Sequence, residues 1–81
     1  MNNQDNFFIY DLNKIQVPKE KQHDFNYAKH LFEEIGNPKV IYVDFNDSTY
    51  SIIIGTLLGS TTFEFCFKSV DGVPLVYFRE G

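Results

Sequence analysis

The chain has 81 residues, of which 43% are hydrophobic and 17% aromatic. This length and apolar content argue against global disorder and predict a single domain over residues 1–81, with residues 1–6 frayed. Eleven acidic and seven basic residues give a net charge of −4, which argues against binding nucleic acid through its phosphates. No membrane span or signal-peptide pattern is evident, so a cytoplasmic location is the default expectation.

The N-terminal part carries a short apolar run at Phe7–Tyr10 and a brief alternation of apolar and polar residues at Ile15–Val17. Between them, residues 11–14 have turn character. We expect one or two short strands within Phe7–Val17, and an amphipathic helix is the alternative.

A helix is expected after Pro18, since proline is well tolerated at a helix start, and Asp24 is a second candidate for its N-cap. Gly36 and Pro38 are typical of the residues that follow a helix, so it should end near Ile35. One apolar stripe recurs at helical spacing, and it comprises Phe25, Ala28, Leu31, Phe32 and Ile35.

The stretch Val40–Arg79 predicts four strands joined by three turns. Asp71-Gly72, between two alternating apolar runs, is the strongest short hairpin signal and predicts a type I′ turn. Gly59-Ser60 fits a type II′ turn, with glycine at its first central position. The remaining turn lies within Phe45–Thr49.

Two-residue turns fix the register of the strands they join. Both registers place Phe63, Phe65 and Phe67 among apolar partners on one face of the sheet. Extending the alternation fills that face with Ile41, Val43, Phe45, Tyr50, Ile52, Ile54, Thr56, Val76 and Phe78. We expect the helix to lie across it, giving an α+β domain with one helix on a four- to five-stranded, mainly antiparallel sheet in the order β-α-β-β-β-β.

The opposite face is polar at its ends and apolar along its middle. Glu64 should lie opposite Arg79 as a cross-strand ion pair, and Pro74 predicts that the last strand is an edge. Left bare, the apolar strip would mark an interface. Either Phe7–Val17 folds over it, or a second copy or a different protein covers it. Its members are Val40, Tyr42, Ile53, Leu57, Cys66, Leu75 and Tyr77.

Few residues point to chemistry. His23 and His30 are seven apart on the expected helix, which places them about 10 Å apart and too far to chelate one ion by themselves. Cys66, the only cysteine, is interpreted as a small packed residue, and Asp44 as a turn or surface residue. We expect no metal, no cofactor and no catalytic site.

The leading hypothesis is a small acidic, non-enzymatic protein-interaction module of inhibitor or adaptor type, which docks a sheet face or edge on a partner protein. A composition rich in Asn, Lys, Ile, Phe and Tyr is compatible with a phage or another bacterial mobile element. One alternative is a homo-oligomeric subunit such as a homodimer, and another is a small enzyme or ligand-binding domain with a composite site at His23, His30 and Asp44. The predicted interface residues are Tyr42, Ile53, Leu57, Leu75 and Tyr77.

Overall fold

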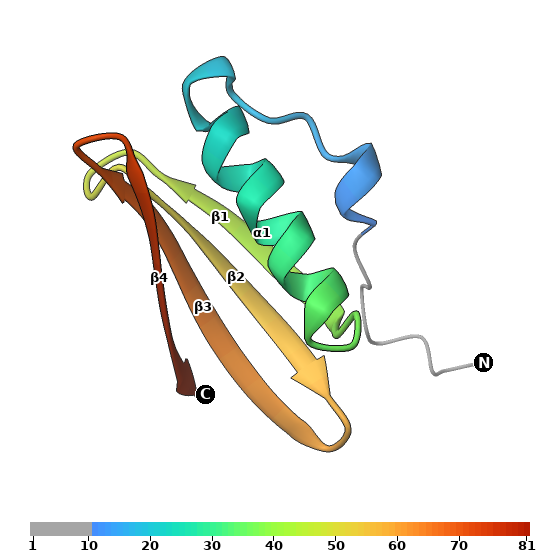
Figure 1. Ribbon diagram of the computed structural model, residues 1–81. Coiled ribbons are helices and arrows are strands. Elements are labelled where there is room, and N and C mark those ends of the chain that lie inside the picture. The colour runs from blue at the N-terminus through green and yellow to red at the C-terminus, as the bar shows by residue number, and fades with distance from the viewer. Residues whose placement is uncertain (1–10) are drawn as a thin grey trace.

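A computed structural model of the protein describes residues 11–81. Its elements are helix α1 (Gln22–Glu34) and strands β1 (Lys39–Asn46), β2 (Ser51–Leu58), β3 (Thr61–Val70) and β4 (Val73–Glu80). The four strands form one antiparallel sheet in the order β1-β2-β3-β4, and α1 lies against one face of it (Figure 1). We call this the inner face and the opposite one the outer face. The α+β architecture is as predicted.

Two short 3-10 turns, Leu12–Lys14 (η2) and Lys19–Lys21 (η3), precede α1. The prediction of a strand at Ile15–Val17 is wrong, because residues 11–18 form no strand. Asp11 instead accepts a hydrogen bond from the Asn13 amide at 2.9 Å, which turns the chain, and the apolar side chains that follow pack against the core beside α1. The strand predicted at Phe7–Tyr10 lies outside the described residues.

Helix α1 ends as predicted. Gly36 and Asn37 have φ angles of 107° and 53°, and the Asn37 amide donates to the Phe32 carbonyl at 2.7 Å, which caps the last turn. The prediction that Asp24 is an N-cap is wrong. Since η3 carries the chain into α1 at Gln22, Asp24 lies inside the first turn, where its carboxylate accepts a hydrogen bond from the Ser69 hydroxyl of β3.

The predicted strand registers are confirmed. Phe65 lies opposite Ile54 on one side and Phe78 on the other, and the neighbouring residue pairs keep the same register. Asp71 and Gly72 both have positive φ, at 53° and 80°, as a type I′ turn requires.

Strand β1 departs from strict alternation at a β-bulge. Val40 lies opposite Thr56 and Tyr42 opposite Gly55, so Ile41 is an extra residue with no partner of its own. Val40 therefore points to the inner face, where it is 4% exposed, and its predicted place on the outer strip is wrong. The prediction that Ile41 belongs to the inner face fails for the same reason.

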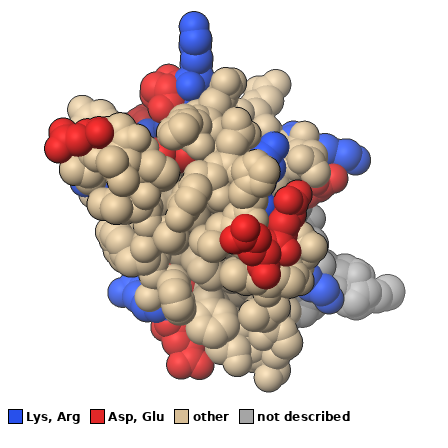
Figure 2. Space-filling model, in the orientation of Figure 1, with Lys and Arg blue, Asp and Glu red and all other residues tan. Residues whose placement is uncertain are grey.

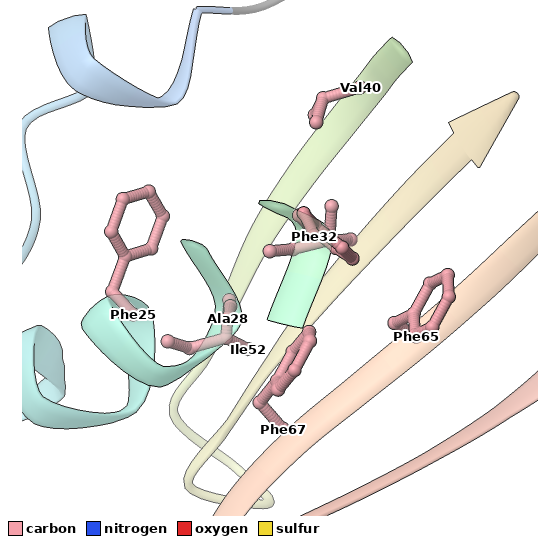
Figure 3. Close-up of a cluster of buried hydrophobic side chains, with 8 residues drawn as sticks. Phe25, Ala28, Phe32, Val40, Ile52, Phe65 and Phe67 are labelled. Carbon is pink, nitrogen blue, oxygen red and sulfur yellow. The ribbon is translucent and has the colours of Figure 1, made fainter. Parts of the chain in front are cut away.

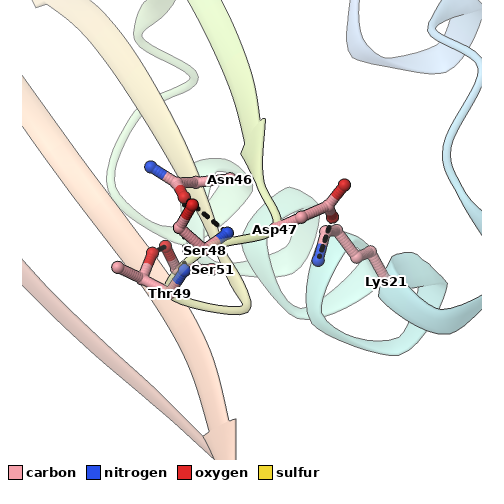
Figure 4. Close-up of polar contacts among 6 residues, drawn as sticks. All are labelled: Lys21, Asn46, Asp47, Ser48, Thr49 and Ser51. Carbon is pink, nitrogen blue, oxygen red and sulfur yellow. Dashed lines mark hydrogen bonds and ion pairs between the residues drawn. The ribbon is translucent and has the colours of Figure 1, made fainter.

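Tyr50, predicted on the inner face, is 76% exposed with a φ of 52°. It lies in a loop, because Asn46 ends β1 and its side-chain oxygen accepts the amides of Ser48 and Thr49 at 3.0 and 3.2 Å (Figure 4). The loop is tied to η3 by Asp47, whose carboxylate lies 3.4 Å from Lys21 Nζ.

The core is the layer between α1 and the inner face (Figure 3). Phe32 of α1 meets Phe65 and Phe67 of β3 edge-on, with ring centroids 5.1 and 5.7 Å apart. Such contacts add to the free energy gained by removing the rings from water. The buried cluster comprises Phe25, Ala28, Phe32, Val40, Ile52, Ile54, Phe65 and Phe67.

The core makes a direct prediction. Phe67→Ala removes a ring that is 0% exposed and should lower the free energy of unfolding by about 3–5 kcal/mol. Phe78→Ala is the matched control, because Phe78 lies on the same face but is 62% exposed. Denaturant unfolding of both variants checks this, and equal losses would contradict the placement of the core.

Candidate interaction surface

Helix α1 does not reach the β4 side of the inner face. Phe78 remains 62% exposed, although the register places it on the face that the helix covers. A groove of about 280 Å³ runs here between α1 and β4, almost wholly lined by apolar side chains. The sequence showed which face these residues occupy, but not how far across the sheet one helix extends. The groove is lined by Leu31, Ile35, Leu58, Phe63, Phe65, Val76 and Phe78.

The outer face is uncovered by residues 11–81, since η2, η3 and α1 all lie on the inner side. Tyr42, Leu75 and Tyr77 are 39%, 47% and 64% exposed on it, and Ile53 and Leu57 are half-buried. All five predicted interface residues thus share this face. Of the two alternatives for covering this face, the folding of Phe7–Val17 over it does not hold for residues 11–17, which lie on the inner side, and residues 7–10 lie outside the described part.

One row of side chains crosses all four strands of the outer face. Tyr42 of β1 reaches over Gly55 of β2, and its hydroxyl donates to Glu64 Oε2 of β3 at 2.6 Å. Glu64 Oε1 in turn accepts Arg79 Nη2 and Nε of β4, at 3.0 and 3.2 Å. The predicted pair of Glu64 and Arg79 is confirmed, and the contribution of Tyr42 was not foreseen.

Gly55 makes this row possible. A Cβ atom at this position would lie 2.0 Å from Tyr42 Cε2, so only glycine lets the ring lie flat against the strand. In return the ring covers the main chain of Gly55, which is buried although the outer face is open.

The row also shifts proton affinities. The hydrogen bond to the Glu64 carboxylate, followed by partial burial, raises the pKa of Tyr42 to about 12. The same hydrogen bond, followed by the contact with Arg79, lowers the pKa of Glu64 below its ordinary value. Both shifts favour a neutral phenol beside a charged carboxylate through the whole neutral range of pH.

The polar row divides the apolar strip. Leu57 lies on one side of it, and Ile53, Cys66 and Tyr77 form a cross-strand line on the other. Hollows of about 410 and 260 Å³ border the pair of Glu64 and Arg79. The outer face therefore offers apolar and aromatic contacts around a fixed pair of charges, a composition typical of protein interfaces.

The residues considered for chemistry do not converge in the described structure. His23 and His30 lie exposed on α1, on the inner side of the sheet, whereas Asp44 lies opposite Ile53 on the outer face. His30 has a distant contact with Glu33, 3.9 Å between Nδ1 and Oε1. Within residues 11–81, no three His, Cys, Asp or Glu side chains gather as metal ligands would.

Comparison with known protein families, with curated proteins and with solved structures found no match to this chain. Among the described residues, no helix has the length and apolar character needed to cross a membrane.

The pKa of Tyr42 can be measured by titrating the tyrosinate absorbance. The neighbouring Cys66 thiol also raises the pKa of Tyr77, so the native chain should be compared with Tyr42→Phe. The difference between the two titrations should have its midpoint near pH 12. Because the folded pKa is raised, the stability that this bond contributes is complete below the unfolded pKa of about 10 and disappears as the pH rises to about 12. A midpoint near 10 would contradict the bond.

The contact between Tyr42 and Gly55 predicts that the effect of Gly55→Ala on stability changes when the Tyr42 ring is removed. Gly55→Ala should destabilise the native chain by about 1–3 kcal/mol, because the new methyl group displaces the ring. In a Tyr42→Ala background the same change should be neutral or stabilising by about 0.5 kcal/mol, since alanine costs a strand less backbone entropy than glycine. Urea unfolding of the native chain, the two single variants and the double variant tests this, and equal costs of Gly55→Ala in both backgrounds would rule out the contact.

Proposed function

We propose that this protein is a non-enzymatic interaction module that docks the outer face of its sheet on a partner protein, as an inhibitor or adaptor. The observation that carries this proposal is the exposure of Tyr42, Leu75 and Tyr77, at 39–64%, on a face that no described element covers. Tyrosines suit such a surface, because each ring buries a large apolar area and ends in a hydrogen-bonding hydroxyl.

The shape and charge of the face agree with a protein ligand. The hollows on either side of Glu64 and Arg79 are each large enough for one or two side chains of a partner. The charged pair between them is already satisfied internally, so a partner would gain orientation from it more than affinity. A net charge of −4 favours partners with a basic docking surface.

A composite catalytic site is the less favoured alternative. The sheet separates the exposed histidines of α1 from Asp44, so within one copy they cannot act on one substrate atom. The geometry supports docking better than acid–base chemistry.

The docking face is tested by Ile53→Lys, which places a charge at its centre, well away from the edge formed by β4. His30→Lys is the matched control, because its side chain is 81% exposed on the far side of the molecule. A protein captured by the native chain and by His30→Lys, but lost with Ile53→Lys, supports the proposal. Circular dichroism of each variant must show the native fold. A partner retained equally by both variants contradicts it.

A further inference from the structure

Within residues 11–81, strand β4 is an open edge of the sheet with side chains exposed on both faces. Val73, Leu75 and Tyr77 are 56%, 47% and 64% exposed, and Phe78, on the other face, is 62% exposed. Its charged residues are confined to the C-terminal end. The surface over the middle of the strand accordingly carries no Lys, Arg, Asp or Glu (Figure 2). Edge strands are normally protected by charges, prolines or bulges. Strand β4 has Pro74 near its start, but it has neither a charge nor a bulge along its middle.

The phase of the main-chain hydrogen bonds shows which residues of β4 face this open edge. The Asp71-Gly72 turn is closed by Val70 and Val73, a pair that bonds across the hairpin. The Gly81 amide donates to the Thr62 carbonyl at 2.9 Å. Gly81 follows Val73 by eight residues, an even number, so the same alternate residues bond to β3 along the whole strand. The odd-numbered residues of β4 therefore bond to β3. The even-numbered ones point their main-chain groups outward, including Pro74, which has no amide to lose.

We propose that a second copy of this chain pairs with β4 in antiparallel orientation, across a two-fold axis at Tyr77, to form a continuous eight-stranded sheet. In this register Val76 of each copy lies opposite Phe78 of the other. Each such pair exchanges two hydrogen bonds, and the Glu80 amide reaches the Pro74 carbonyl. This gives about six new main-chain bonds in the dimer.

The strand is complementary to itself in this register. On the inner face, Val76 meets the exposed ring of Phe78 beside the apolar groove. On the outer face the two Tyr77 rings meet, and Leu75 lies opposite the stem of Arg79. No like charges oppose one another. Shifting the axis to Val76 leaves about four main-chain bonds in place of six, because Glu80 then lies opposite Gly72 in the turn. Shifting it to Phe78 places Glu80 against Val76 and leaves Leu75 without a partner side chain.

The helix does not obstruct this pairing. Because α1 lies over the other strands, both copies keep their helices on the same side and away from the new junction (Figure 1). The apolar side chains now exposed on β4 amount to roughly 400 Å² per copy. An interface of that size belongs to the weak, transient class, so dissociation constants in the micromolar range or above are expected. The inference goes beyond the proposed function and does not depend on it. The pairing uses the strand edge and contacts Leu75 and Tyr77 at the margin of the outer face, and it leaves Tyr42, Ile53 and Leu57 free.

The first test is sedimentation equilibrium of the native chain from roughly 1 µM to 1 mM, beside Val76→Pro and Val76→Ala. Both variants shorten the side chain, but only Val76→Pro removes an amide that points to the open edge. We expect a dimer whose dissociation constant rises at least about tenfold more with Val76→Pro than with Val76→Ala. A native chain that remains monomeric overturns the proposal and leaves the edge to residues 1–10 or to another protein.

The second test fixes the register and does not depend on how Val76→Pro folds. In a Cys66→Ala background, Tyr77→Cys places two thiols across the axis, where opposite Cα atoms are about 4.5 Å apart. Leu75→Cys is the matched control on the same face, about 13 Å from its own copy. Mild oxidation should link the first variant and not the second. Equal linking of both, or a dimer that Ile53→Lys dissociates and Val76→Pro does not, overturns the proposal.

Discussion

Helix α1 is the one long element that covers the sheet in residues 11–81, and its size decides which surfaces the molecule exposes. A helix with its side chains is about 10–12 Å across, whereas four strands at about 4.8 Å spacing are wider than this. The rings of Phe25 and Phe32 therefore reach β1 and β3, and Phe78 of β4 stays in water. The described elements outside the sheet all lie on this same side, so residues 11–81 provide no second layer over the outer face.

The row from Tyr42 to Arg79 gives the outer face a defined arrangement of side chains across all four strands. Each exposed polar contact in it contributes little by itself. Together they link four strands that otherwise meet only their nearest neighbours, and Gly55 allows the phenol ring to lie close enough for the link to form. A face held in this way is preorganised, which would reduce the ordering cost of binding the proposed partner.

Much of this fold could be predicted because glycine-containing turns fix register. Asp71-Gly72 and Gly59-Ser60 determined the pairing of three strands, and with it the placement of Phe65 and Phe67 in the core. No such turn precedes β1, so nothing in the sequence signalled that alternation breaks at Ile41. The candidate surface was predictable to the same extent. The facing of Ile53, Leu75 and Tyr77 followed from register, but their exposure depends on whether another element packs over the outer face, which register alone does not determine.

The bulge in β1 has a consequence for how this strand can change in length. Removing one residue elsewhere in a strand turns every side chain beyond that point to the opposite face. Removing Ile41 would join Val40, which faces inward, directly to Tyr42, which faces outward, and strict alternation would be restored. Every other residue of β1 would keep its face. The extra residue is thus the one position in this strand where a single-codon deletion leaves the core and the outer row in place.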